Sequence, residues 1–282
     1  MTTPLIIESP QDMAAWSQAK RNGGQRIAFV PTMGFLHEGH QSLLRHGRTQ
    51  ADALVMSLFV NPTQFGPNED LARYPRDLEG DLEKAAAEGT DVVFAPRAEQ
   101  LYPAGYQTFI EVEQVSQGLC GDRRPGHFRG VATVVAKLFN IVRPHVAMFG
   151  EKDFQQLAVI RRMVLDLNMD VDIVGLPTVR EPDGLAKSSR NTYLSAQERA
   201  RALSLSRGLQ AAVSLRAVGE TSAAVLRAAA YAELSGHVDR LEYLEVRDAE
   251  SLRLVDQVER PAVILVAAHI GKTRLIDNMR LD

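Results

Sequence analysis

The chain has 282 residues, which is enough for one large domain or two modest ones. With 45% hydrophobic and 24% charged residues it has the composition of an ordinary globular protein, which excludes collagen-like and disordered classes. The formal net charge of −3 gives no electrostatic case for a dedicated nucleic-acid-binding protein, because phosphate neutralisation needs a concentrated surplus of Lys and Arg.

Buried strands are predicted where short apolar runs occur, at residues 27–31, 53–60, 91–95, 146–149 and 171–176. Apolar residues at helical spacing predict helices across 131–142 and 154–167. This alternation predicts an α/β protein, with a mainly parallel sheet covered by helices on both faces. Such sheets bind ligands at the carboxyl ends of their strands.

The pattern changes at residue 177, where a polar loop with prolines and a glycine begins. We expect a first domain at 1–176, a junction loop at 177–190 and a smaller α+β domain at 191–282. In that last part, Ser195 and Glu198 have the spacing of a capping box and predict the start of a long helix. A further helix is predicted at 221–235, and strands at 241–246, 262–268 and 273–276.

The single cysteine, Cys120, can form neither an internal disulfide nor a multi-thiolate metal site, and its role is left open between a free buried thiol and something more specific. Residues 1–11 show no secretory or transit signal. The apolar run at 262–268 is well short of the ~20 residues that cross a bilayer. We therefore expect a cytoplasmic protein with no membrane-spanning segment.

Two common nucleotide-binding signatures are absent. No two glycines are separated by one residue, so the dinucleotide fingerprint Gly-x-Gly-x-x-Gly cannot occur. Gly271-Lys272-Thr273 resembles the end of a P-loop, but the earlier glycine that this motif requires is replaced by Val266.

The strongest local motif is residues 31–40, which follow the first predicted strand and precede a helix. Its glycines allow close backbone approach, a helix N-terminus offers free amides, and His37 and His40 can face one anion. Phosphate binding is the favoured interpretation. A structural turn, or a metal site with both histidines as ligands, remains open.

Two further motifs suit a small polar substrate and an anion. Asn61 and Gln64 follow the next strand and can present amide groups, although for this motif by itself an Asn-Pro turn that ends the strand is the favoured explanation. Arg124 and His127 belong to a cationic turn before a helix, which is either an anion site or a solvated loop.

The last two motifs also combine charge with polar groups. Lys152 and Gln156 are four residues apart, so we expect them on one side of a helix, with Asp153 nearby for an ion or as a helix cap. Lys187-Ser188-Ser189-Arg190 ends the junction loop and is either a phosphate clamp or a charged linker.

In their order and spacing, these motifs together resemble the pantoate–β-alanine ligase (pantothenate synthetase) family. That resemblance implies a Rossmann-like, doubly wound parallel sheet of the superfamily that includes class I aminoacyl-tRNA synthetases. His37-Glu38-Gly39-His40 and Lys187-Ser188-Ser189 are similar to its two signature elements. It also implies ATP-dependent activation of pantoate as pantoyl adenylate, followed by attack of β-alanine, and a homodimer that binds no nucleic acid.

The resemblance implies the following site. Catalytic residues would be His37, His40, Lys152 and Arg190, with His37 and His40 stabilising the transferring phosphate, His40 also a candidate proton donor, and Lys152 and Arg190 neutralising pyrophosphate. The ATP site would comprise Met33, Gly34, Phe35, Leu36, His37, Glu38, Gly39, His40, Gly150, Glu151, Lys152, Asp153, Val179, Lys187, Ser188, Ser189 and Arg190. Gln64 and Gln156 would bind pantoate, Gln64 also β-alanine, with Asn61, Arg124 and His127 as weaker candidates. Mg²⁺ would accompany ATP, with Asp153 or Asp81 contributing.

Two other functions stay open from the sequence. A nucleotidyltransferase would use the His-x-Gly-His element equally well, although the Gln64 and Gln156 motifs favour the ligase. A non-catalytic RNA-binding relative would need a basic surface, which the net charge does not indicate.

Overall fold

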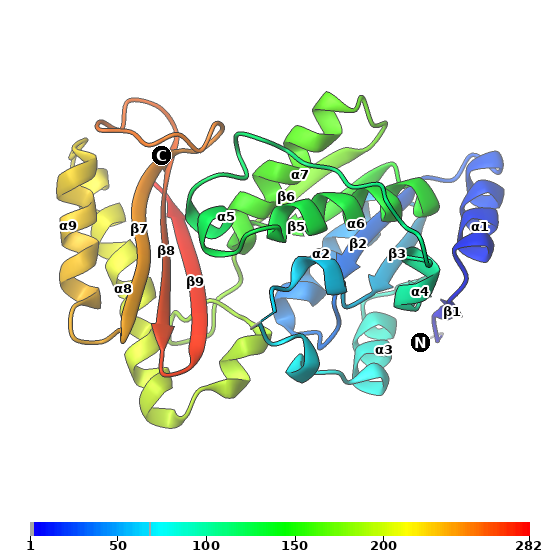
Figure 1. Ribbon diagram of the computed structural model, residues 1–282, viewed down its shortest axis with the longest axis horizontal. Helices are drawn as coiled ribbons and strands as arrows, with labels where there is room; N and C mark the ends of the chain where they lie inside the picture. The colour runs from blue at the N-terminus through cyan, green and yellow to red at the C-terminus, as the bar shows by residue number, and fades with distance from the viewer. Residues whose placement is uncertain (1–2, 68) are drawn as a thin grey trace.

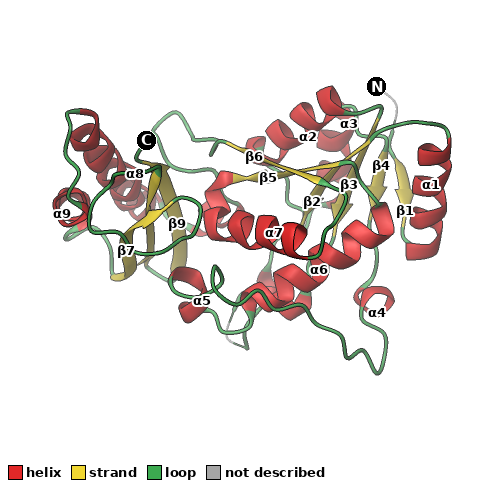
Figure 2. Cartoon of the chain, turned by 90° about the horizontal axis from the view of Figure 1, so that it is seen from above, coloured by secondary structure: helices red, strands yellow, loops and turns green. Residues whose placement is uncertain are grey.

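The computed structural model describes residues 3–67 and 69–282. Two separate sheets organise the chain, as Figures 1 and 2 show. The larger is a six-stranded parallel sheet made of β1 (Leu5–Ile7), β2 (Ile27–Thr32), β3 (Ala53–Leu58), β4 (Val92–Phe94), β5 (Val146–Gly150) and β6 (Asp172–Leu176). The α/β prediction with a mainly parallel sheet is confirmed.

The strand order is β1-β4-β3-β2-β5-β6, so β2 lies between β3 and β5. The chain winds outward in one direction through β3 and β4, and in the other through β5 and β6. The carboxyl ends of β2 and β5 therefore form the switch point at which doubly wound sheets bind ligands.

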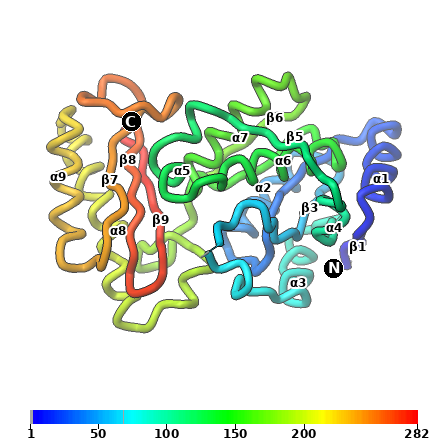
Figure 3. Tube along the Cα trace, in the orientation of Figure 1, coloured from blue at the N-terminus to red at the C-terminus, as the bar shows by residue number. Residues whose placement is uncertain are grey.

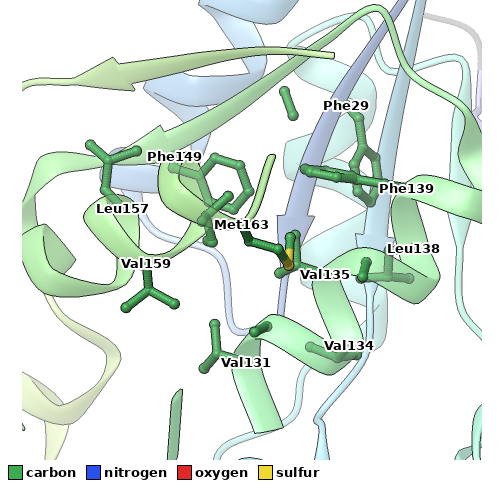
Figure 4. Close-up of a cluster of buried hydrophobic side chains, with 14 of the residues drawn as sticks. Phe29, Val131, Val134, Val135, Leu138, Phe139, Phe149, Leu157, Val159 and Met163 are labelled. Atoms are coloured by element: carbon green, nitrogen blue, oxygen red, sulfur yellow. The ribbon is translucent and has the colours of Figure 1, made fainter. Parts of the chain in front are cut away.

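Helices cover both faces of this sheet because alternate strand residues point to opposite sides. Phe29 and Val55 pack toward α1 (Pro10–Asn22), α6 (His127–Val142) and α7 (Phe154–Asp166). Val30 and Met56 pack toward α2 (Glu38–Gln50) and α3 (Leu78–Ala87). Figure 4 shows the first of these clusters, in which Phe29 and Phe149 each meet the ring of Phe139 edge-on.

The antiparallel sheet has the order β7-β8-β9 and is formed by β7 (Arg240–Asp248), β8 (Ala262–Ile270) and β9 (Thr273–Arg280). Helices α8 (Ala196–Ala217) and α9 (Ala223–Leu234) pack against it, on the outer side of the molecule in Figure 1. The capping box is confirmed: the Ser195 amide donates to Glu198 at 2.9 Å, and the Glu198 amide donates to Ser195 Oγ at 3.2 Å.

Short helical turns complete the chain: η1 (Pro62–Gln64), η2 (Leu71–Arg73), α4 (Ala98–Leu101), α5 (Leu119–Arg123), η3 (Glu151–Asp153) and η4 (Ser189–Tyr193). The tube in Figure 3 shows the chain between α4 and α5 running from the parallel sheet to the side of β9. Within residues 3–67 and 69–282, none of the helices combines the length and apolar character needed to cross a bilayer.

The strand predictions hold, with small differences at their ends. The strand predicted at 53–60 ends at Leu58, and β1 was missed because three residues carry too little pattern to recognise. The expected division at 177–190 falls between the two sheets, yet Tyr243 and Val263 share one hydrophobic cluster with Phe128 and Val131. The two parts therefore pack together, and the domain limits stay a prediction.

Candidate active site

One cavity lies at the carboxyl ends of β2, β3, β5 and β6. Near these strand ends it is lined by Pro31, Thr32, Phe59, Phe149, Gly150 and Pro177. The structure brings most of the predicted site residues into the same cavity: Met33, His37, Gly39, His40, Asn61, Gln64, Arg124, His127, Gly150, Lys152, Asp153, Gln156, Val179, Lys187, Ser188, Ser189 and Arg190. All five sequence motifs thus contribute to one site.

The two histidines at the start of α2 are oriented by the main chain. His37 is the N-cap, and its Nδ1 accepts from the Gly39 amide at 3.1 Å. His40 Nδ1 accepts from the His37 amide at 3.3 Å. An acceptor nitrogen carries no proton, so in the neutral ring the proton is on Nε2. Both rings, whose centroids are 4.1 Å apart, therefore have an Nε2–H donor available for a ligand.

Both histidines are uncharged at neutral pH. Burial, followed by the charges of Lys152 and Lys187, lowers the pKa of His37 from 6.5 to about 4. Burial and the neighbouring His37 lower the pKa of His40 to about 3. The pair therefore supplies hydrogen-bond donors, and the positive charge of the site comes from lysine and arginine.

The two arginines of the site are held by carboxylates that the sequence analysis did not single out. Arg190 donates to both oxygens of Asp70 at 3.0 and 2.9 Å, and Arg124 donates to both oxygens of Glu69 at 2.7 and 2.6 Å. Burial alone would raise the pKa of each carboxyl, but the paired guanidinium holds it below its usual value. Adjacent acidic residues in a loop gave no signal, because their partners lie far away in the sequence.

His127 is buried between Arg124 and the main chain. Its Nε2 lies 2.9 Å from the Arg124 guanidinium, which can only donate, so its Nδ1–H donates to the Gln64 carbonyl at 2.9 Å. Burial and the charge of Arg124 lower the pKa of His127 to about 4. The predicted cationic turn thus carries its charge on Arg124 and holds the loop of Gln64 through a neutral His127.

We expect the folded protein to lose stability as the pH falls from about 6.5 to 5. In that window the unfolded chain binds protons at His37, His40 and His127 that the folded chain does not bind. A fully buried histidine contributes up to about 1.4 kcal/mol per pH unit, and the window lies above the range in which carboxylates titrate. Urea unfolding of the wild type and of His127→Asn at several pH values tests this. An equal slope for both would contradict it.

The amide of Asn61 supports Gln64. Asn61 is 1% exposed, and its Nδ2 donates to Gln64 Oε1 and to the Gly130 carbonyl, both at 3.1 Å. Its Oδ1 accepts from Tyr102 at 3.0 Å. The Gln64 oxygen thereby accepts one bond that fixes the amide, and the Gln64 Nε2, 3.1 Å from Met33 Sδ, is a donor for a ligand.

Lys152 and Gln156 both line the cavity, but they are not on one helix. Lys152 lies in η3 and Gln156 in α7. The Asp153 carboxylate makes no capping bond to α7, which removes the capping alternative, and it lies 3.9 Å from the Lys152 ammonium. Burial would raise the pKa of Asp153, but Lys152 and Arg190 hold it below its usual value.

Several residues expected in the ATP site do not line the cavity. These are Gly34, Phe35, Leu36, Glu38 and Glu151. Leu36 packs in the core, Glu38 pairs with Arg45, and Glu151 pairs with Arg280. Gly34 has φ +86°, where an added Cβ would lie 2.8 Å from Leu58 and 2.9 Å from Asp81. Their part is to shape the loops that carry the lining residues.

The structure argues against the expectation that Asp81 binds a metal. Its side chain is fully buried outside the cavity lining, and its two oxygens accept from the Phe35 and Leu36 amides at 2.7 and 2.6 Å. Within the described residues, no group of three His, Cys, Asp or Glu side chains is arranged for a metal. Asp81 instead anchors the loop between β2 and α2, and His37 and His40 have no third ligand there.

Asp81→Ala is expected to destabilise the protein by about 1–3 kcal/mol for each loop amide that stays buried without an acceptor. The free energy of unfolding in urea measures this. Glu83→Ala, on the exposed side of the same helix, is the matched control and should change stability by less than about 0.5 kcal/mol. An Asp81 variant as stable as the control would show that the loop does not depend on the carboxylate.

The apolar wall of the cavity was not predicted as part of the site. It consists of Leu43, Val131, Val134, Val135, Leu138 and Met148. The four of these residues that lie in α6 have helical spacing that indicated a core face, which they also form. Periodicity alone could not separate the residues that meet a ligand from those that meet the sheet.

The sheet is doubly wound, and the cavity at its switch point combines a helix N-terminus, neutral imidazoles and several cations. These features together are typical of an α/β enzyme that uses a nucleotide. Comparison with known proteins gives the particular family. The model of the pantoate-β-alanine ligase family matches residues 5–280, so the chain belongs to that family and is a ligase.

Individual relatives agree over nearly the full length. The chain is 60% identical to a pantothenate synthetase of Geobacter sulfurreducens, over 97% of each protein, and 58% identical to one of Myxococcus xanthus, over 99% of this chain and 96% of the relative. A crystal structure of pantothenate synthetase from Thermus thermophilus superposes with a TM-score of 0.93 at 42% identity, covering 98% of this chain and 99% of that one. A pantoate-β-alanine ligase from Francisella tularensis, complexed with beta-gamma ATP and β-alanine, superposes with a TM-score of 0.80 at 33% identity, covering 99% and 98%.

Proposed function

We propose that this chain uses ATP to activate pantoate as pantoyl adenylate and then joins the pantoyl group to β-alanine. The products are pantothenate, AMP and pyrophosphate, and the reaction serves pantothenate and coenzyme A biosynthesis. The observation that carries this is the composition of the cavity, which combines side-chain amides and an apolar wall with cations, hydroxyls and a helix N-terminus.

The amides and the apolar wall of the cavity suit pantoate. This acid has a carboxylate, two hydroxyls and a pair of methyl groups. Gln64 Nε2 and the Gln156 amide are donors for its oxygens, while Val134, Val135 and Leu138 offer an apolar surface to its methyls. A nucleotidyltransferase acting on another molecule has no need of this combination.

In the first step a pantoate carboxylate oxygen attacks the α-phosphorus of ATP, and the bond to the β-phosphate oxygen breaks. The Nε2–H groups of His37 and His40 and the positive end of the α2 dipole face the α-phosphate, and Lys152 neutralises charge that develops there. Lys187, Ser188, Ser189 and Arg190 hold the departing pyrophosphate, with Val179 contacting the adenine side. Arg190 reaches it by sharing or exchanging its bonds to Asp70.

In the second step the β-alanine amine attacks the acyl carbon, and the bond from that carbon to the phosphate oxygen breaks, which releases AMP. The amine loses a proton. His37 and His40 are not free bases, because each Nδ1 accepts a main-chain bond and each Nε2 carries a proton. We therefore assign this proton to water or to the phosphate of the leaving group.

Asp153 is the protein ligand we assign to Mg²⁺. Its carboxylate is half exposed at the cavity and is held ionised by Lys152 and Arg190. One carboxylate fits an ion that takes its other ligands from phosphate oxygens and water. When bound, the ion would neutralise phosphate charge and orient the triphosphate.

We further propose that the protein is a cytoplasmic homodimer that acts on small molecules and not on nucleic acid. Light scattering during gel filtration tests the oligomeric state, and a mass near 31 kDa instead of twice that value would refute the dimer. Salt-dependent RNA binding without AMP release would instead favour the non-catalytic relative.

The direct experiment incubates the purified protein with ATP, Mg²⁺ and pantoate, with and without β-alanine, and follows all products by mass spectrometry. Pantothenate and AMP formed together only with β-alanine support the proposal. Pyrophosphate without an amide would point to another nucleophile, and no turnover would refute the ligase reaction.

A further inference from the structure

The antiparallel sheet reaches into the active site through one side chain of β9. Asn278 Nδ2 donates to the carbonyl oxygens of Glu151 and Lys152, each at 2.9 Å. Asn278 is 6% exposed, so both bonds are shielded from water. In Figure 1, β9 is the strand of its sheet on the side of the parallel sheet. The bonds therefore join the C-terminal sheet to the turn that carries Lys152.

The turn that receives these bonds has little support of its own. It is η3, which consists of one 3-10 turn. In the described part of the chain, neither η3 nor the start of α7 has a side-chain cap. Among the described residues, the Lys152 ammonium has one ion-pair partner, Asp153, at 3.9 Å. In such a turn, the direction of the Lys152 side chain depends on the groups that bind the carbonyl oxygens of the turn.

The strand that provides Asn278 is itself firmly held. The neighbouring Asp277 is 3% exposed and accepts from Arg180 at 2.7 and 2.9 Å. Arg180 also donates to the Asn278 carbonyl at 3.2 Å. It lies in the junction loop, where the Lys187 amide donates to the Val179 carbonyl at 2.9 Å. Asp277 and Asn278 of β9 thus contact the η3 turn, which carries Lys152, and the junction loop, which carries Lys187.

We propose that Asn278 is a positioning residue for catalysis, which fixes the main chain at Glu151 and Lys152 so that the Lys152 ammonium faces the phosphates of ATP. This rests on the proposed function in that Lys152 binds those phosphates. An amide suits the task because it donates to two carbonyls without adding charge beside Lys152. The C-terminal sheet thereby takes part in the adenylation step without touching the substrate.

A double-mutant cycle separates this role from a general structural one. Asn278→Ala, Lys152→Ala and the double variant are compared by pantoate-dependent exchange of pyrophosphate into ATP, and by the affinity for a non-hydrolysable ATP analogue in calorimetry. We expect Asn278→Ala to lower the exchange kcat by about 10- to 100-fold, as misplaced catalytic groups do. In the Lys152→Ala background, the same substitution should have no further effect on analogue affinity.

The matched control is Arg280→Ala, which removes a neighbouring bond from β9 to the Glu151 carboxylate but leaves the two carbonyl bonds intact. Its exchange rate should stay within about twofold of wild type. If Asn278→Ala does not fold, Asn278→Ser replaces it in the cycle.

The proposal would be overturned if Asn278→Ala lowered the analogue affinity equally in the wild-type and the Lys152→Ala protein. Such a result would mean that Asn278 does not act through Lys152. A wild-type protein without pantoate-dependent exchange would refute the proposed function instead. The cycle in analogue affinity would still decide the role of Asn278.

Discussion

Lys152→Ala is expected to lower the rate of pantoyl adenylate formation by about 10²- to 10³-fold, the usual cost of removing one group that stabilises transition-state charge. Stability should change little, because within residues 3–67 and 69–282 the one ion pair of the Lys152 ammonium is the long one with Asp153. Exchange of pyrophosphate into ATP measures the rate of adenylate formation, and thermal unfolding measures the stability.

Lys272→Ala is the matched control, since Lys272 is exposed in the turn between β8 and β9. It should retain wild-type exchange. Wild-type exchange by Lys152→Ala would remove Lys152 from the reaction and would also leave Asn278 with nothing to position.

His40→Ala is expected to lower the same rate by about 10²-fold, because the α-phosphate loses an Nε2–H donor that stabilises developing charge. The imidazole is already neutral, with a pKa of about 3, so the loss is that of a hydrogen bond and not of a charge. Some stability is also lost, because His40 Nδ1 accepts the His37 amide in the helix cap.

His40→Gln distinguishes the two effects, since its amide can donate toward the phosphate. Partial recovery of exchange by this variant supports the donor role. His46→Ala, on the same helix but outside the cavity lining, should behave as wild type. Exchange at the wild-type rate in His40→Ala would refute the assignment.

Local pattern was a good guide to the parallel sheet and to the lining of the cavity. Apolar runs predicted β2 to β5, because buried parallel strands are apolar on both faces. The run at 171–176 also forms a strand, β6, but that strand is not buried as predicted. The position of His37, Gln64 and Lys152 directly after strands predicted that they would meet, since the ends of parallel strands lie at one edge. The capping box at Ser195 was equally visible, as its two members are three residues apart.

Other parts of the site depend on residues that are distant in the sequence. The family resemblance implied Asp81 as a candidate metal ligand, but its partners are the amides of Phe35 and Leu36 in another loop. Glu69 and Asp70 hold the guanidiniums of Arg124 and Arg190, which lie more than fifty residues along the chain. Spacing along the sequence cannot indicate pairs of residues that lie so far apart in the chain.

The sequence by itself determined the alternation of strands and helices, the motifs at the strand ends and the family, because these follow from spacing along the chain. Only the tertiary structure decided the protonation of His37 and His40, the support of Gln64 by Asn61 and the contact of Asn278 with the turn of Lys152. The physical reason is that burial, charge and hydrogen bonding act through space. The groups that set them come from loops and strands that the fold alone brings together.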